Sequence, residues 1–426
     1  KLPNKPIIVQ RLAHAAARHA LYPLLLLSVC SPANAQTSYT SNSATGAWNT
    51  NRWNNSTDGP SYTNAYTANQ NVSFTSGTYS FAGMGATINV GNITVASGVT
   101  VNFSAAANTL ATNGAVRTIE VGAGGVIDFS TQSFSTTSGT GFIKNGTGVL
   151  ALAGNTYNGG FTLNAGTIIL RGVNAMGGAA SNLLTLNGGT VASNATRIMD
   201  DTKYGAGISI GGNIQFGELS TVVSLASSSA NLSFANNVSL GSAVRTLTLG
   251  NNGTQTFSGI FSNTSGGITF AANPGTDGRF DITNTANTFT GNITVTGGEV
   301  RFTADGSLGN AANDIFIDGG RFAKASDSTT LTLGAGREIF VGDTAGTSIS
   351  TPGAGTLVYN SSIADITGKT GTWAKQGGGM LELGGSSTYT GGTAINNGTV
   401  KLITGDNRLP TGTVVSLGQA ASANTQ

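Results

Sequence analysis

Hydrophobic and polar residues alternate in short runs along most of this chain, and turn residues separate the runs. The runs at 87–90, 93–95, 99–103 and 126–129 place Val, Ile or Phe at alternate positions. A period of two gives a strand one apolar face and one polar or small face. Glycines such as Gly98 stand between the runs, and no window carries a helical stripe with caps. The pattern predicts an all-β fold.

Three segments of the chain read almost alike: residues 146–170, 283–302 and 377–402. Each leads through an aromatic-x-Gly turn to an alternating run behind a glycine. Repeats of this kind predict stacked units that bury one continuous core. We therefore predict a right-handed parallel β-helix, a solenoid, over residues 71–426, with corner Asn and Thr side chains forming hydrogen-bonded ladders.

Further similarities connect these segments over longer distances in the sequence. Residues 174–191 resemble residues 305–322, and a third such stretch begins at 407–418. Four aromatic residues stand two positions before a glycine, at separations of 100, 32 and 100 residues: Tyr157, Phe257, Phe289 and Tyr389. A β-propeller is the alternative architecture, but its blades usually repeat evenly, so this spacing favours the solenoid. Because the pattern is still running when the sequence stops, we expect a chain truncated at its C-terminus.

The first 35 residues differ from the rest. Basic residues precede an apolar run at 21–30, and Ala33 and Ala35 offer small residues for cleavage. This order is typical of a secretory signal peptide, which we predict at residues 1–35, with a buried hydrophobic helix as the alternative. Residues 36–70 form a polar lead-in rich in aromatic side chains. We interpret it as an N-terminal cap, because an open first rung invites edge-to-edge pairing; adhesive display of the aromatics is the alternative.

Composition limits the chemistry. Charged residues make up 9% of the chain, and Gly supplies 63 of 426 residues without the strict period of collagen. His14, His19 and Cys30 are the only residues of their kinds, and all lie within the predicted signal peptide. The mature chain then has no disulfide, thiol nucleophile, His-dependent triad or His/Cys metal site, and we expect neither metal nor cofactor.

The net charge and the expected cellular compartment limit the kinds of partner that the protein can bind. The formal net charge is +2, and it becomes −2 once the four basic residues of the signal peptide are removed. Such a balance gives no reason to expect nucleic acid. Secretion without disulfides favours the surface of a Gram-negative bacterium, where we expect the protein to be extracellular or at the cell surface.

The repeated segments resemble the autotransporter-associated β-strand repeat, also called the passenger-associated transport repeat. We place these repeats at about 143–171, 280–302 and 375–402. The first copy matches the family pattern at ten positions: Gly146, Gly148, Leu150, Leu152, Gly154, Asn155, Thr156, Tyr157, Gly159 and Gly166. The third copy matches at Gly377, Gly379, Leu381, Leu383, Gly384, Tyr389, Gly391 and Gly398. The middle copy keeps Phe289 and Gly291 but lacks the leading G-x-G-x-L-x-L, which leaves its first strand unassigned.

The resemblance implies a secreted passenger that folds as a β-helix outside a Gram-negative cell, with repeats that support export and folding. In typical members an outer-membrane β-barrel follows the passenger, so we expect such a barrel, if present, beyond residue 426. The expected role is structural or adhesive, and the expected partners are glycans, host surfaces or neighbouring cells. We expect no nucleic-acid partner.

Carboxylates are the remaining route to catalysis. The densest group is Arg197, Asp200, Asp201 and Lys203, which could bind calcium or a uronic acid, or perform acid–base work. A polysaccharide lyase or hydrolase is therefore the alternative function, although a solvated loop accounts for the same residues and we predict no enzyme. Asp277 and Asp281 suggest an ordinary polar turn. Tyr157, Phe289 and Tyr389 are interpreted as packing aromatics, with a row of sugar-stacking platforms as the alternative.

Overall fold

A computed structural model describes the chain at residues 38–41, 45–47, 53–55, 70–83, 88–103, 109–111, 114–129, 133–135, 140–154, 159–172, 174–177, 179–218, 226–262, 266–325, 327–403 and 405–418. The chain divides into two compact units, Lys1–Gln36 and Thr37–Gln426. The predicted signal peptide lies outside the described residues, as does most of the predicted cap.

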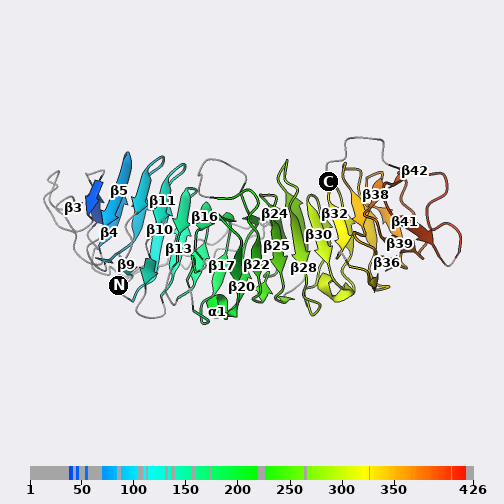
Figure 1. Cartoon of the computed structure of the whole chain (residues 1–426), viewed down its shortest axis with the longest axis horizontal. Helices are drawn as coiled ribbons and strands as arrows, with labels where there is room; N and C mark the ends of the chain where they lie inside the picture. The colour runs from blue at the N-terminus through cyan, green and yellow to red at the C-terminus, as the bar shows by residue number, and fades with distance from the viewer. Residues whose placement is uncertain are drawn as a thin grey trace, which may run out of the picture. The chain divides into compact units, whose positions relative to one another are not determined.

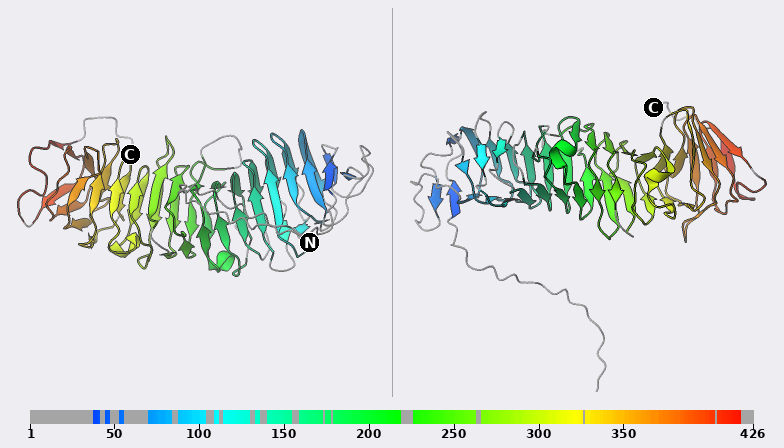
Figure 2. Two further views of the ribbon diagram at one scale, coloured as in Figure 1. Left: turned by 180° about the vertical axis from the view of Figure 1, so that it is seen from behind. Right: turned by 90° about the horizontal axis from the view of Figure 1, so that it is seen from below.

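The second unit is a parallel β-solenoid whose turns stack one on another (Figures 1 and 2). In chain order its strands visit three faces in rotation. The strand pairings among the described residues are parallel, except that β1 (Ser38–Ser41) and β3 (Trp53–Asn55) pair antiparallel at one end of a sheet. Helix in the described part of the chain amounts to α1 (Asp201–Tyr204) and the 3-10 turn η1 (Asp305–Leu308). The predicted all-β parallel solenoid is confirmed.

The first face consists of two sheets. The longer one contains β1 (Ser38–Ser41), β4 (Asn71–Phe74), β7 (Ile93–Val95), β10 (Arg117–Val121), β13 (Phe142–Asn145), β15 (Phe161–Leu163), β17 (Leu184–Leu186), β20 (Ile208–Ile210), β23 (Val238–Ser239) and β26 (Phe261–Ser262). The shorter one contains β33 (Thr330–Thr332), β36 (Thr356–Tyr359), β39 (Met380–Leu383) and β41 (Thr399–Leu402).

The second face is one sheet of 14 strands. It contains β2 (Thr45–Ala47), β5 (Thr78–Gly83), β8 (Thr100–Phe103), β11 (Val126–Phe129), β14 (Val149–Leu152), β16 (Thr167–Leu170), β18 (Thr190–Ser193), β21 (Ile214–Phe216), β24 (Arg245–Leu249), β27 (Ile268–Ala272), β29 (Ile293–Val295), β31 (Ile315–Ile317), β34 (Ile339–Val341) and β37 (Ile363–Asp365).

The third face again consists of two sheets. The shorter one contains β6 (Ile88–Asn89), β9 (Thr109–Ala111) and β12 (Ser133–Ser135). The longer one contains β19 (Arg197–Met199), β22 (Leu232–Phe234), β25 (Thr254–Phe257), β28 (Arg279–Ile282), β30 (Glu299–Phe302), β32 (Arg321–Lys324), β35 (Ser348–Ser350), β38 (Trp373–Gln376), β40 (Thr393–Ile395) and β42 (Val415–Leu417).

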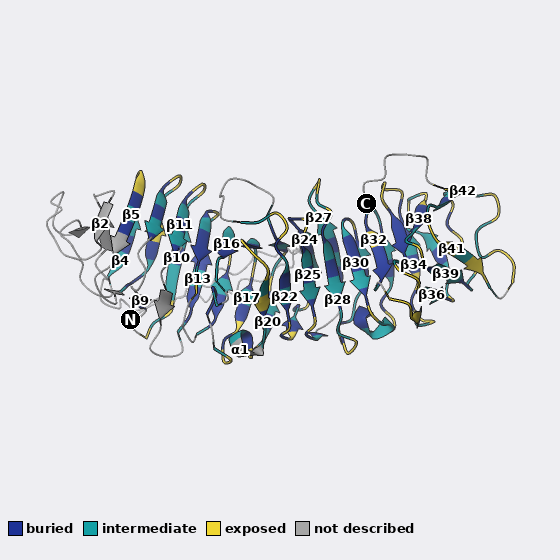
Figure 3. Cartoon of the chain, in the orientation of Figure 1, coloured by how far each residue is buried: buried dark blue, intermediate teal, exposed yellow. Residues whose placement is uncertain are grey.

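Alternation along the strands builds the core. Inward residues stack on the same position of the next turn, as in the rings of Phe81, Phe103 and Phe129, whose centroids lie 5.1 and 4.5 Å apart. The buried residues form one main cluster that extends from Val72 to Tyr389 (Figure 3). The predicted corner ladders are also present: Asn164 Nδ2 donates to Asn145 Oδ1 at 2.8 Å, and other Asn side chains bridge turns in the same way.

Each repeat interrupts a different face. After β14 and again after β16 the chain returns to the first face without a third-face strand among the described residues. After β28 and β30 it skips the first face, through residues 283–292 and 303–314. After β39 and β41 the second face receives no strand among the described residues, and β37 is the last strand of its sheet. The three repeats therefore end a sheet on each face in turn.

Candidate functional site

In the middle and third repeats, the aromatic-x-Gly loop closes the edge of the sheet that the repeat ends. In the middle repeat, Asn287 Oδ1 accepts a hydrogen bond from the Phe261 N–H at 2.8 Å, and the Thr288 N–H donates to the Phe261 carbonyl at 2.9 Å. In the third repeat, Ser387 Oγ and the Thr388 N–H make the same two contacts with Ile363, at 3.3 and 2.8 Å. The loop thus satisfies backbone groups that an open sheet edge would leave unpaired.

The aromatic side chains of these loops point inward. Phe289 and Tyr389 are both buried, and the Tyr389 hydroxyl lies 2.5 Å from Thr393 Oγ1. Their rings are therefore covered by protein rather than presented to a ligand, while Tyr157 lies outside the described residues. Phe257 shares the spacing but not the loop: it lies within β25, with its ring 4.9 Å from that of Phe234. The aromatic-x-Gly spacing is therefore shared by residues in a closing loop and by a residue within a strand.

The remaining pattern residues of the repeats serve packing. Four leucines are buried in the core: Leu150, Leu152, Leu381 and Leu383. Gly166 and Gly398 have φ of +75° and +73°, and a Cβ at either would lie 2.4 or 2.3 Å from a glycine carbonyl of the preceding turn. At the other pattern glycines that flank a strand, a Cβ would also meet the backbone of a neighbouring turn: Gly146, Gly148, Gly159, Gly291 and Gly391. Gly154 has open space around it.

Two buried lysines donate hydrogen bonds to the backbone of the turns that contain these glycines. We call each such turn, with its lysine, a corner of the solenoid. Lys144 Nζ donates to the carbonyls of Asn145 and Gly146 at 2.6 and 2.7 Å and to Ala165 of the next turn at 3.2 Å. Lys375 does the same at the equivalent corner of the third repeat. Burial lowers the pKa of each ammonium to about 8. These residues were not expected from the sequence, although K-x-G-x-G in both copies is a signal that could have found them.

The four charged residues that the sequence places near α1 do not form one cluster. Lys203 Nζ lies 3.1 Å from Asp200 Oδ2 within a single helical turn. Arg197 instead donates to the Arg171 carbonyl at 2.9 Å and to Asn194 Oδ1 at 2.7 Å. The side chain of Asp201 lies outside the description. The structure therefore pairs Asp200 with Lys203 but directs Arg197 to a different corner.

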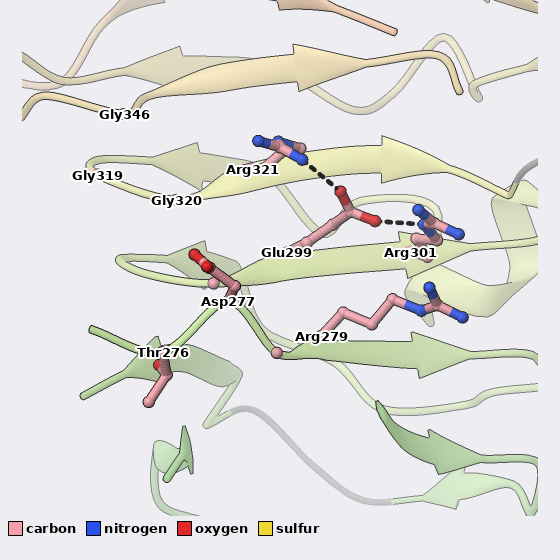
Figure 4. A pocket seen from close by; sticks show the side chains of 11 residues that line it. Thr276, Asp277, Arg279, Glu299, Arg301, Gly319, Gly320, Arg321 and Gly346 are labelled. Atoms are coloured by element: carbon pink, nitrogen blue, oxygen red, sulfur yellow. Dashed lines mark hydrogen bonds and ion pairs between the residues drawn. The ribbon is translucent and has the colours of Figure 1, made fainter. Parts of the chain in front are cut away.

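A surface groove lies on the third face, in the middle repeat and the turns that follow it (Figure 4). Its volume is about 660 Å³. Strands β28, β30 and β32 and the turns before them supply most of its lining: Thr276, Asp277, Gly278, Arg279, Gly298, Glu299, Arg301, Gly319, Gly320, Arg321 and Gly346. Sequence reasoning noted Asp277 as an ordinary turn residue and missed the groove.

Charged side chains alternate across this groove because their strands are in register. Arg279 pairs with Glu299, which pairs with Arg321, and Asp281 pairs with Arg301. Glu299 forms ion pairs with both Arg321, at 2.9 Å, and Arg301, and Figure 4 draws both contacts. Arg279 Nε lies 3.0 Å from Asp281 Oδ1. The signal in the sequence is R-x-D, E-x-R and R at outward strand positions of three consecutive turns.

The described residues contain no group of three or more His, Cys, Asp or Glu side chains placed to hold a metal ion. No helix among them is long and apolar enough to cross a bilayer.

The fold and its closing loops define a parallel β-solenoid with three internal transport-type repeats. The family model described as Passenger-associated-transport-repeat matches residues 142–170, 277–302 and 374–402. The resemblance predicted from the sequence is thereby confirmed, including the middle copy. There, β28 supplies the strand that the sequence left unassigned.

One curated relative is similar to a large part of the chain. The Adhesin BmaC autotransporter of Brucella suis biovar 1 (strain 1330) is 32% identical over 203 residues. That alignment covers 45% of this chain and 6% of the relative, so the chain spans a small fraction of the relative's length. No solved structure matches the chain significantly.

Proposed function

We propose that this chain forms part of a secreted passenger, exposed on the surface of a Gram-negative bacterium, with a structural and adhesive role. The observation that carries the proposal is the set of three passenger-type repeats built into one β-solenoid. The similarity to an autotransporter adhesin supports the same role. An outer-membrane barrel would be the partner that carries the passenger across the membrane.

The architecture suits export as an unfolded chain. Each turn of a solenoid contacts mainly its neighbours, so folding can begin at one point and propagate as the chain emerges. The repeats add closed sheet edges at intervals, through Asn287 and Ser387, which limits exposed strand edges in a partly folded chain. We propose that this is how the repeats support export and folding.

Binding rather than catalysis is the proposed activity. Asp200 is engaged by Lys203 in its own helical turn, and Arg197 is engaged elsewhere. The expected partners are glycans and the surfaces of host or neighbouring cells. Hydrolysis or elimination of a polysaccharide by the purified chain, lost in the double variant Asp200→Asn/Asp201→Asn, would overturn this part of the proposal.

Display on cells tests the proposed role. Residues 36–426 would be fused to an outer-membrane barrel in a non-adherent Gram-negative host, with the barrel alone as the matched control. We expect the chain to be accessible to added protease and to increase attachment of the bacteria to cell layers or to one another. A chain that is displayed and folded but raises neither kind of attachment above the barrel control would contradict the adhesive role.

A further inference from the structure

We propose that the groove on the third face binds an acidic polysaccharide, through the sugar carboxylates or sulfates of an extended chain. The proposal rests on the adhesive function proposed above and names its ligand class and site. It concerns the groove over β28, β30 and β32, which has a volume of about 660 Å³.

The direction of the groove fits a polymer. Its lining includes glycines from the turns that precede four consecutive strands of this face: Gly278, Gly298, Gly320 and Gly346. Successive strands of a sheet lie about 4.8 Å apart, so the groove crosses the strands and follows the stacking direction over four turns.

Two arginines of the groove are more accessible than the acids that they contact. The side chains of Arg279 and Arg321 are 38% and 47% exposed, whereas the carboxylates that they contact, Asp281 and Glu299, are 19% and 11% exposed. The acids are therefore more deeply buried than the arginines, and their ion pairs hold the guanidinium groups in place. A guanidinium fixed in this way loses little side-chain entropy when it binds a carboxylate or sulfate.

The spacing of the arginines favours a polymer with widely spaced charges. Arg279 and Arg321 occupy the same strand position two turns apart, with Glu299 between them. Two turns separate the backbone positions of these arginines by about 9.6 Å, and a flexible side chain at each end lets their guanidinium groups span an extended disaccharide. Asp277 stands exposed at the rim. An acid on every second sugar can therefore meet each arginine while a neutral sugar lies over Glu299.

A nucleic acid fits this site poorly. Nucleic-acid binding relies on many phosphate contacts and a strongly basic surface, whereas the whole chain has a formal net charge of +2. The rim carboxylate and the shielded acids also oppose a polymer with one charge on every unit. We therefore assign the groove to acidic glycans.

Binding of the purified chain to immobilised polymers tests the assignment. The probes are hyaluronan, which has carboxylates on alternate sugars, kappa-carrageenan, which has sulfates on alternate sugars, dextran as a neutral polymer and single-stranded DNA as a dense polyanion. We expect binding to hyaluronan, kappa-carrageenan or both, and weaker binding to dextran and DNA. Equal binding to dextran, or tighter binding to DNA, would overturn the proposal.

Variants locate the site. Arg279→Gln/Arg321→Gln is expected to weaken binding of the acidic polymer by roughly tenfold or more, because two charge-assisted contacts are lost. The double variant Arg171→Gln/Lys401→Gln removes two ion-paired charges from other faces and is expected to bind as the unaltered chain does. Circular dichroism would confirm that both variants fold.

The outcomes separate the groove from the general function. If the groove variant retains full binding, or if both double variants lose binding equally, the site is wrong. If the unaltered chain binds neither acidic polymer but still promotes attachment when displayed on cells, the groove proposal fails and the adhesive function stands. If display promotes no attachment while the groove variant loses acidic-polymer binding, the site stands and the adhesive function fails.

Discussion

The first and third repeats share a corner that the middle repeat builds differently. Lys144 and Lys375 stand at the same register position, each opposite the third residue of the strand in the next turn. Phe270 occupies that position in the middle repeat. The same inward position of the repeat therefore holds a charged, hydrogen-bonded side chain in two copies and an apolar ring in the third copy.

The turn that follows explains the exchange. In the first repeat three residues, 146–148, connect β13 to β14, whereas six residues, 273–278, connect β27 to β28. The short turn directs carbonyls inward, and the lysine ammonium satisfies them. In the long turn the Asn273 carbonyl already accepts hydrogen bonds from the N–H and hydroxyl of Thr276. Thr276 and the residues after it also line the groove.

The outward positions differ even more. In the first repeat Ala151 and Ile169 are buried in a small cluster on the outer side of the second face. The middle repeat places four charged residues at the equivalent outward positions, and the third has a single pair, Glu382 with Lys401 at 2.8 Å. The closing loop and the inward register are kept, while the turn and the outer surface vary. The same repeat backbone can therefore present different side chains on its outer surface.

Placing a lysine at the middle corner gives the largest expected effect. Phe270→Lys would bury an ammonium beside a turn whose Asn273 carbonyl is already satisfied, and would remove the contact with the Phe280 ring at 5.1 Å. We expect a loss of about 3–5 kcal/mol in the free energy of unfolding, the usual cost of an uncompensated buried charge. Urea unfolding measures the loss, and hydrogen exchange of β27–β30 locates it.

Phe270→Leu is the matched control, because it reduces volume without adding charge. Its expected cost is about 1–2 kcal/mol. Equal stability of the lysine and leucine variants would show that the long turn accepts an ammonium as well as the short turns do. The distinction between the two corners would then have no energetic basis.

The lysine corners and the phenylalanine corner should also differ in how their contribution to the free energy of unfolding depends on pH, and this effect is expected to be smaller. Desolvation lowers the pKa of Lys144 and Lys375 from an ordinary value of 10.5 to about 8. Between these two values the unfolded chain binds more protons than the folded chain, so stability rises with pH. Each lysine can contribute up to about 3 kcal/mol to this rise. Phe270 contributes nothing at the middle corner.

Other groups also titrate in this range, so the comparison requires a variant. Urea unfolding at pH 7.5 and pH 10.5 would compare the unaltered chain with Lys144→Met/Lys375→Met. We expect the stability of the unaltered chain, relative to the variant, to increase at the higher pH. A relative stability that stays constant or decreases would show that the carbonyl contacts keep both ammonium groups charged in the folded chain.

Much of the fold follows from local pattern. The runs at 93–95 and 126–129 are β7 and β11, and the run at 99–103 contains β8. Alternation and turn glycines specify such strands without reference to the rest of the chain. The packing role of Phe289 and Tyr389 was also the preferred interpretation, and both side chains are buried.

The groove depends on information that local pattern lacks. Arg279 and Arg321 are 42 positions apart in the sequence, and they occupy the strand positions on either side of Glu299 only because three turns of different length stack in one register. The same register places Lys144 and Lys375 inside a core where alternation predicts apolar residues. The lengths of the turns between strands determine which residues become neighbours in adjacent rungs. A single sequence does not show which residues of a long turn lie outside the strands.

The outer ion pairs give the smallest expected contrast. Glu299 is 11% exposed and contacts two arginines, whereas Glu382 is 19% exposed and contacts one lysine that is itself 54% exposed. Glu299→Gln should lower the free energy of unfolding by about 1–2 kcal/mol, because Arg301 and Arg321 lose a charged acceptor. Glu382→Gln should change it by less than about 0.5 kcal/mol, as is usual for an exposed pair. Urea unfolding at low and high salt measures both, and salt should reduce the smaller effect further. Equal effects would show that the charged wall of the groove is an ordinary solvated surface, without the fixed arginines that its ligand requires.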